Sequence, residues 1–176
     1  MDKAAFSYAE ALFLIAKEEK KEEEYLSSLY EVCTAFEENP EYSVFLSSYT
    51  VSAEKRVEAF REAFGGKLPE NVESFICILC EKRRTGELKE ITEEYEKMYF
   101  AENSISKAYV TSAYPLDMNQ REKLKNRLEE ICGHRVKAEF FTDKNLLGGI
   151  KIEIDGKVID STVRSRLNKL REVMDR

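Results

Sequence analysis

The sequence predicts a mainly α fold, in which an N-terminal six-helix bundle is followed by a small α+β domain of order β-α-β-β-α. Apolar residues in the first hundred positions recur at spacings of three and four, which is typical of amphipathic helices. Beyond Ser104 apolar and polar residues alternate as in strands, and Asp155-Gly156 between two such segments is a strong hairpin signal. A chain of 176 residues can hold two modest cores, so we expect domains at 1–104 and 105–176.

The six helices are expected between ordinary start and stop signals. Pro40 follows the second helix, Ser52 caps the fourth, and Gly65-Gly66 ends it. Pro69 opens the fifth helix, and Thr85-Gly86 ends it. The links are short, which favours a bundle of neighbouring helices. The expected helical segments are 4–17, 25–36, 42–49, 52–64, 72–82 and 88–99.

The second unit begins with the alternating segment "SKAYVTSAY". Asp117 and Gln120 form a capping box for a helix that ends at Gly133, and "VKAEFF" then alternates again. The segments "GIKIEI" and "KVID" flank the Asp-Gly turn. Asp160 or Ser161 is expected to cap a final helix, whose apolar face would carry Val163, Leu167, Leu170 and Met174.

Charge and cysteine usage narrow the class of protein. Residues 1–104 carry 23 acidic and 13 basic residues, a net charge of −10, whereas residues 105–176 carry 11 and 15, a net charge of +4. This asymmetry indicates two units with different surfaces and different partners. The four cysteines lie in apolar helical patterns, which favours buried, reduced thiols in a cytosolic protein. No apolar run reaches the ~18 residues that a membrane span needs, so we expect an unprocessed chain without direct membrane insertion.

Residues suited to catalysis or metal binding are few. His134 is the only histidine, and Cys77-x-x-Cys80 lies inside a helical pattern without a second pair, so we expect no metal site and no cofactor. Cys132 and His134 are close in sequence, but His134 is expected beside the last carbonyls of its helix. Gly148-Gly149 precedes a strand, unlike the phosphate loops that open a helix. We therefore expect no catalytic residue and no enzyme activity.

Two helices carry more apolar surface than one core-facing stripe requires. The apolar residues of the first helix cover an arc of about 220 degrees, against the ~100 to 150 degrees that one buried face needs. The fifth helix has six apolar residues in a row, from Phe75 to Cys80. These could be central helices, buried on several sides. Alternatively, they could form a groove for an amphipathic helix of another protein, where Tyr8, Ala9 and Ala11 would suit such contact.

Nucleic-acid binding is the main alternative, because the second unit is basic and its order of elements is similar to that of small RNA-binding domains. However, a Gly-x-x-Gly clamp is absent, no strand shows an aromatic stacking pattern, and basic residues alternate with acidic ones. A solvated helix surface accounts for the charge more simply.

Several motifs together resemble one family. "LLGGIKIEIDGKVIDSTVRSRLNKL" is similar to the C-terminal signature of the delta subunit of F-type ATP synthases, known in mitochondria as the oligomycin-sensitivity-conferring protein. "YAEALFLIAKEE" resembles the opening helix of that family, and "TSAYPLDMNQREKL" resembles its strand-to-helix segment. Two positions depart from the usual pattern: "DST" replaces Asp-Gly-Ser after the hairpin, and "EKRRTGEL" replaces an Asn-Gly-Arg segment after the fifth helix.

The resemblance implies a non-catalytic stator subunit at the cytoplasmic face of the bacterial cell membrane, as a peripheral part of the synthase. Helices 1 and 5 would hold the N-terminal helix of an alpha subunit, and the second domain would engage the C-terminal end of the b subunits. The resemblance does not imply a nucleic-acid partner. For the head contact we expect Tyr8, Ala11, Leu12, Ile15, Val72, Phe75, Ile76 and Leu79, and for the stalk Arg164, Leu167 and Leu170.

Overall fold

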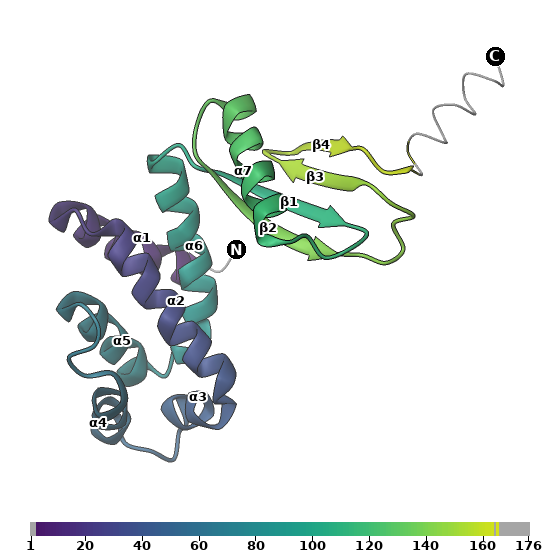
Figure 1. The fold of residues 1–176 in the computed structure, drawn as a ribbon. Helices are drawn as coiled ribbons and strands as arrows, with labels where there is room; N and C mark the ends of the chain where they lie inside the picture. Colours follow the sequence, from purple (N-terminus) through teal and green to yellow (C-terminus); the bar gives the residue numbers. More distant parts are fainter. Residues whose placement is uncertain (1–2, 164, 166–176) are drawn as a thin grey trace. The chain divides into compact units, whose positions relative to one another are not determined.

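The structure is a computed structural model that describes residues 3–163 and 165 (Figure 1). The chain divides into two compact units, Met1–Tyr99 and Phe100–Arg176. The described residues form seven α-helices, one 3-10 turn and a four-stranded sheet, so the prediction of a mainly helical chain with a small sheet is confirmed. The division between the units falls inside the sixth helix, before the predicted boundary at residue 104.

Each of the six segments predicted as helices in the first unit contains a helix, but the third helix ends at Ser47, so the prediction that Tyr49 lies on it is wrong. Ser52 caps the fourth helix as predicted, because its Oγ accepts a hydrogen bond from the Lys55 amide at 3.4 Å. The fifth helix ends differently: Arg83 takes the left-handed conformation with φ 59°, and the predicted stop at Thr85-Gly86 is instead part of a 3-10 turn, η1 (Thr85–Glu87). The helices are α1 (Lys3–Glu19), α2 (Glu22–Glu38), α3 (Pro40–Ser47), α4 (Ala53–Phe64), α5 (Glu70–Lys82) and α6 (Leu88–Glu102).

The core of the first unit brings side chains from all six helices out of solvent. Ala5, Ala9 and Ala16 are buried on α1, and such small residues let neighbouring helices approach closely. Phe13 of α1 meets Tyr95 of α6 edge to face, with ring centroids 5.3 Å apart. The Tyr95 hydroxyl donates a hydrogen bond to the Glu22 carbonyl at 3.1 Å, so this ring also fixes the start of α2.

A buried arginine connects α4 with the end of α5. The side chain of Arg56 is 1% exposed, and its guanidinium donates to the carbonyls of Cys80 (2.9 Å), Glu81 (3.2 Å), Ser48 (3.2 Å) and Val51. The last carbonyls of a helix have no partner within that helix, and a cation there is favoured by the helix dipole. Arg56 thus stabilises the C-terminal end of α5 and the loop before α4 together.

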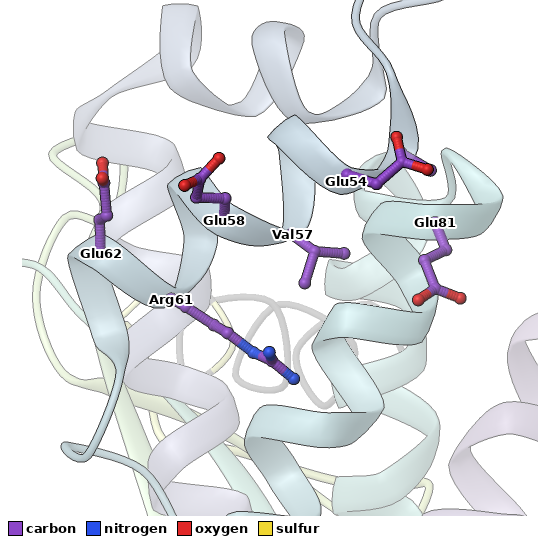
Figure 2. Close-up of a pocket in the computed structure, with 7 residues that line it drawn as sticks. Glu54, Val57, Glu58, Arg61, Glu62 and Glu81 are labelled. Carbon is purple, nitrogen blue, oxygen red and sulfur yellow. The ribbon is translucent and has the colours of Figure 1, made fainter.

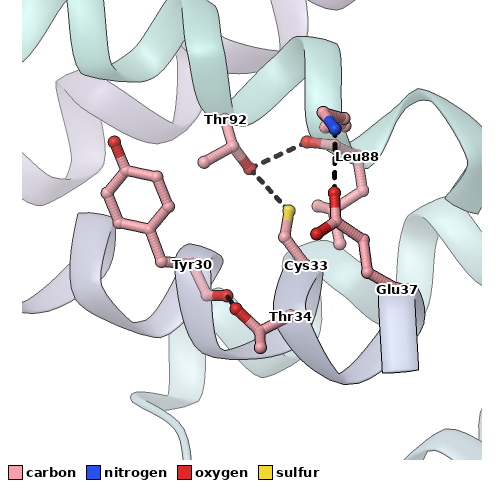
Figure 3. Close-up of polar contacts among 7 residues, drawn as sticks. Tyr30, Cys33, Thr34, Glu37, Leu88 and Thr92 are labelled. Carbon is pink, nitrogen blue, oxygen red and sulfur yellow. Dashed lines mark hydrogen bonds and ion pairs between the residues drawn. The ribbon is translucent and has the colours of Figure 1, made fainter. Parts of the chain in front are cut away.

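A polar seam lies between α2 and α6 (Figure 3). The Thr92 hydroxyl donates to the Leu88 carbonyl at 2.8 Å, so the Cys33 thiol, 3.3 Å away, is the donor to the Thr92 oxygen. At the surface, Lys89 Nζ lies 2.8 Å from Glu37 Oε1. Buried polar groups cost stability unless they are hydrogen-bonded, and this seam meets that condition.

Thr85 differs from Thr92, and the pair gives a matched test. The hydroxyl oxygen of Thr85 is buried and has no hydrogen-bond partner among the described residues. We expect Thr85→Val to raise the free energy of unfolding by about 1 kcal/mol, because valine keeps the shape and removes an unsatisfied polar group. Thr92→Val should lower it by a similar amount, since the Cys33 thiol loses its acceptor. Urea titration of both variants checks this; a loss of stability in Thr85→Val would contradict it.

The second unit contains one helix packed against a four-stranded sheet. The strand order is β2-β1-β3-β4, with β1 parallel to β2 and the other neighbours antiparallel. Leu128 of α7 packs with Ala108, Val110, Ile152 and other sheet residues to form the core. The predicted capping box is confirmed: Asp117 Oδ1 accepts from the Gln120 amide at 2.8 Å, and Gln120 Oε1 accepts from the Asp117 amide at 3.1 Å. The elements are β1 (Ser106–Ser112), α7 (Met118–Cys132), β2 (Val136–Thr142), β3 (Ile150–Ile154) and β4 (Lys157–Asp160).

Two details of the predicted second unit are wrong. The order β-α-β-β-α counts one strand too few, because both arms of the predicted hairpin, β3 and β4, pair as strands alongside β1 and β2. The cap after β4 is neither Asp160 nor Ser161. Thr162 Oγ1 accepts from the Ser165 amide at 3.2 Å, while Asp160 turns the chain by accepting from the Thr162 amide at 2.9 Å. Of the predicted final helix, all residues beyond Ser165 lie outside the described part of the chain.

The paired glycines serve a close backbone approach. Gly149 has φ +87°, and a Cβ added there would lie 2.5 Å from the Ser161 carbonyl oxygen. Two backbone hydrogen bonds flank this contact. The Val163 amide donates to the Gly148 carbonyl at 3.1 Å, and the Ser161 amide donates to the Ile150 carbonyl at 3.0 Å. The expectation that Gly148-Gly149 is structural, and no phosphate loop, agrees with this geometry.

Gly149 and Gly156 provide a second matched pair. Gly156 also has positive φ, +73°, but nothing lies within 4 Å of a Cβ added there. We expect Gly156→Ala to lower the free energy of unfolding of this unit by about 1 kcal/mol through backbone strain alone. Gly149→Ala should cost clearly more, because strain and a clash with backbone add together. Amide hydrogen exchange in β1 and β3 measures both; equal losses would contradict the close approach.

Candidate partner-binding site

One flank of α1 keeps apolar residues at the surface. Ala4, Tyr8, Ala11 and Ile15 follow one another at spacings of four, three and four, so they share one side of the helix. Ile15 is 41% exposed and Ala11 is exposed, while Tyr8 is half-buried. The adjoining flank, which carries Leu12, is buried in the core. The wide apolar arc of α1 is therefore divided into a core side and a surface side.

The fifth helix is divided in the same way. Val72, Ile76 and Leu79 are fully buried, whereas Phe75 is half-buried and Ile78 is 45% exposed. At 100 degrees per residue, Asn71, Phe75, Ile78 and Lys82 share a flank about 65 to 125 degrees away from the centre of Val72, Ile76 and Leu79.

The exposed flanks of α1 and α5 meet. The rings of Tyr8 and Phe75 touch edge to face, with centroids 6.2 Å apart. Asn71 Nδ2, at the start of α5, donates to Glu19 Oε1, at the end of α1, at 2.7 Å. The guanidinium of Arg84 lies 5.8 Å from the centre of the Tyr8 ring, so the two helices run antiparallel. We call the surface made by Ala4, Tyr8, Ala11, Leu14, Ile15, Phe75 and Ile78 the α1–α5 face.

The structure separates the eight predicted head-contact residues into two sets. Tyr8, Ala11, Ile15 and Phe75 reach the surface on the α1–α5 face. The other four are 0 to 1% exposed and belong to the core, where they hold the two helices in place: Leu12, Val72, Ile76 and Leu79. The first alternative, burial in the core, therefore applies to one flank of each helix.

The predicted set omitted three exposed large apolar residues of these helices, Phe6, Leu14 and Ile78, of which Leu14 and Ile78 belong to the α1–α5 face. Leu14 is 57% exposed. Leu14 and Ile78 both fall off the main apolar face of their helix, which was the signal available in the sequence. The predicted stalk residues Arg164, Leu167 and Leu170 lie outside the described residues, and the structure adds nothing about them.

The Cys77-x-x-Cys80 pair is buried in the first unit. Burial raises the pKa of the Cys80 thiol to about 12, with a smaller contribution from Cys77, and burial also raises the pKa of Cys77. Thiolates, not thiols, bind metals and attack electrophiles. No group of three potential ligands among histidine, cysteine, aspartate and glutamate is found in the described part of the chain.

These raised pKa values predict slow thiol chemistry. In mildly alkaline buffer, Cys77 and Cys80 should react with a disulfide reagent only as fast as the first unit opens. The unfolded thiol loses its proton near its ordinary pKa of 9 and the folded Cys80 thiol near about 12, so folding stability should fall as pH rises through that window. Stopped-flow labelling measures the rate, with Cys80→Ala to assign it. Cys33 and Cys132 are partly exposed, so only rapid labelling of Cys77 or Cys80 in the folded chain would contradict the burial.

Ser106, His134 and Asp155 form a polar cluster in the second unit. Ser106 Oγ lies 2.6 Å from both His134 Nε2 and Asp155 Oδ2, and His134 Nδ1 donates to the Cys132 carbonyl at 2.9 Å. The predicted position of His134 beside the last carbonyls of its helix is confirmed. A nucleophilic relay needs the histidine between serine and carboxylate, but here the buried serine stands between the other two. The cluster instead ties the start of β1 to the β3–β4 turn.

An open cavity of about 870 Å³ lies beside α4 (Figure 2). It is lined by charged side chains of α4 and by Glu81 of α5, and Arg61 lies 3.7 Å from Glu73 at its side. The lining is mostly acidic and includes none of the predicted partner-binding residues. It consists of Ala53, Glu54, Val57, Glu58, Arg61, Glu62 and Glu81. A cluster of carboxylates on a solvated helix face is ordinary surface.

An aromatic pair lies on the sheet of the second unit. No single strand shows an aromatic pattern, but the parallel pairing of β1 with β2 brings Tyr109 and Phe141 together, with centroids 6.2 Å apart. On the same strands, Lys107 Nζ lies 2.9 Å from Glu139 Oε1. The basic residue is therefore paired with an acidic one.

Comparison with known proteins shows the family. The family model of the ATP synthase delta (OSCP) subunit matches residues 4–174. The chain belongs to this family. The ATP synthase subunit delta of Acetivibrio thermocellus is 33% identical over 168 residues, which cover 95% of this chain and 94% of the relative. That of Clostridium beijerinckii is 32% identical over 167 residues, which cover 95% and 93%. The family resemblance of the sequence motifs is confirmed.

A solved structure shows the same fold. A chain of the Toxoplasma gondii mitochondrial ATP synthase hexamer superposes with a TM-score of 0.70 and 21% identity, over 98% of this chain and 97% of that chain. None of the helices in the described part of this family member combines the length and apolar character that a membrane span requires.

Proposed function

We propose that the chain is a non-catalytic stator subunit of an F-type ATP synthase, which joins the alpha/beta catalytic head to the b subunits of the peripheral stalk. Membership in the delta (OSCP) family supports this role. A stator keeps the head from turning with the rotor, so that torque drives nucleotide chemistry in the head. The chain would then lie at the cytoplasmic face of the bacterial cell membrane, as a peripheral part of the complex.

The α1–α5 face is the observation that carries the proposal. Leu14, Ile15 and Ile78 are exposed on two antiparallel helices, which meet at the Tyr8–Phe75 ring pair. An amphipathic helix that lies on such a surface buries its apolar stripe and gains about 25 cal/mol for each Å² of apolar surface removed from water. We propose that the N-terminal helix of the alpha subunit occupies it.

The second unit would bind the C-terminal end of the b subunits. Its net charge is opposite in sign to that of the first unit, which fits a different partner. We propose Arg164, Leu167 and Leu170 as stalk contacts because the family motif covers them. No cofactor, metal ion or catalytic residue of this chain takes part in the proposed role, which depends on protein contacts alone.

A peptide titration tests the head contact. A synthetic peptide of the alpha subunit's N-terminal helix, added to the isotope-labelled full chain, should shift the amide signals of α1 and α5. Ile15→Asp should weaken binding at least about tenfold, because it removes an apolar contact and would bury a charge. Val44→Asp is the matched control: Val44 is 68% exposed on α3, away from the α1–α5 face, and the affinity should stay unchanged.

Two outcomes would overturn the proposal. Absence of peptide binding, or equal loss of affinity in both variants with folding intact by circular dichroism, would remove the head contact. The RNA-binding alternative gains no support from these comparisons. It would be revived if the full chain bound single-stranded RNA with an affinity that falls steeply with salt.

A further inference from the structure

Donors and acceptors do not balance in the Ser106–His134–Asp155 cluster when the imidazole is neutral and the carboxylate is ionised. The Cys132 carbonyl can only accept, so its contact of 2.9 Å with His134 Nδ1 requires a proton on that nitrogen. A neutral imidazole then leaves Nε2 as an acceptor, and an ionised Asp155 carboxylate also only accepts. Both acceptors lie 2.6 Å from Ser106 Oγ, which has a single proton to donate. One of these two contacts would therefore lack a proton.

One additional proton completes the cluster. With it, His134 Nε2 donates to Ser106 Oγ and the serine hydroxyl donates to Asp155 Oδ2, so each of the three contacts has one donor and one acceptor. This proton belongs on the histidine, because a free imidazole is more basic than a free aspartate by about 2.6 pH units. The cluster is then an imidazolium and a carboxylate bridged by a serine hydroxyl, and hydrogen bonds to charged groups are the stronger ones.

The surroundings of His134 carry charges of both signs. The histidine follows the end of α7, where the last carbonyl groups favour a cation. Ser106 is 6% exposed and His134 is half-buried, but Asp155 is exposed, so water weakens its attraction for the imidazolium. The bridge to Asp155 adds a directed attraction to this mixed background. The other titratable side chains beside the cluster are Glu129 and Cys132 of α7, Arg135 in the next loop, Lys107 of β1, which pairs with Glu139, and Lys157 of β4.

We infer that the cluster is a pH-sensitive latch, in which protonated His134, bridged by Ser106 to Asp155, holds the β3–β4 turn against the start of β1. Between about pH 4 and 6.5 a free imidazole is protonated and a free carboxylate ionised, so closed and open latch hold the same protons. Above about pH 6.5 the open latch loses a proton that the closed latch keeps, so the ratio of closed to open should fall as pH rises. The fall should be roughly two- to fivefold in total, which is the range for one exposed ion pair. The latch belongs to the second unit whatever that unit binds, so it does not depend on the proposed function.

The variant Asp155→Asn separates the latch from the fold. The asparagine Nδ2 can donate to Ser106 Oγ, which frees the serine proton for a neutral His134, so this cluster closes without the additional proton. Asp155 has φ 48°, and asparagine tolerates the left-handed conformation as well as aspartate does. Asp143→Asn is the matched control, because it changes the net charge of the same unit equally in the loop after β2. The Asp143 carboxylate accepts from the Asn145 amide at 2.9 Å, a turn that asparagine also forms.

Nitrogen NMR of the full chain measures the proton directly. His134 is the only histidine, so its two ring nitrogens give unique signals. In the unmodified chain and in Asp143→Asn, the ring should lose its proton at a pH about 0.3 to 0.7 units higher than in Asp155→Asn, which corresponds to the same two- to fivefold difference. Equal titration of the ring in all three chains overturns the latch.

Amide hydrogen exchange in the β3–β4 turn measures the opening. After correction for the intrinsic effect of pH on exchange, opening at residues 154–157 should become more frequent between pH 6 and 8 in the unmodified chain, and stay constant in Asp155→Asn. Ser106→Ala removes the bridging hydroxyl and keeps the charges, so it should make opening frequent at both pH values. If Ser106→Ala leaves the turn as protected as before, or if opening in the unmodified chain does not change with pH, the latch is wrong.

Discussion

The packing of α1 is the constraint on which the first unit depends. Its small residues Ala5, Ala9 and Ala16 let the helix lie close to its neighbours, and Phe13 fixes it against Tyr95 of α6. The neighbours of α1 cover only part of its apolar arc of about 220 degrees, so Leu14 and Ile15 stay exposed. This apolar surface would leave water if the proposed alpha-subunit helix lay on it.

The second constraint is that the last carbonyl groups of α5 need hydrogen-bond donors. Arg56 bonds the carbonyls of Cys80 and Glu81, and without it these groups would be buried unpaired. Since α5 contributes Phe75 and Ile78 to the α1–α5 face, the position of that face depends on Arg56, which is itself buried. The helical pattern contains a signal for this role, because Arg56 shares one side of α4 with the buried Phe60 and Phe64.

Periodicity predicted the helices well because it depends on the chain alone. It could not divide the α1 arc into a core flank and a surface flank, because the division depends on where α2, α5 and α6 pack. Leu12 and Ile15 look equivalent in the sequence, yet one is buried and the other 41% exposed. The same limit explains the second unit: the Tyr109–Phe141 pair and the bond from Ser106 to Asp155 join segments far apart in the chain.

Competition between neighbouring residues for the same capping position explains the error in predicting the cap after β4. Asp160, Ser161 and Thr162 can each cap a helix, and the sequence does not rank them. The contact with Gly149 selects Thr162 as the cap. It places the backbone of Ser161 and Thr162 against the glycine and leaves Thr162 Oγ1 facing the Ser165 amide. Two backbone bonds, Val163 to Gly148 and Ser161 to Ile150, then join this segment to the start of β3. A pull on the chain at Val163 is therefore resisted by backbone hydrogen bonds to the start of β3, a mechanical property that the proposed stalk contact would use.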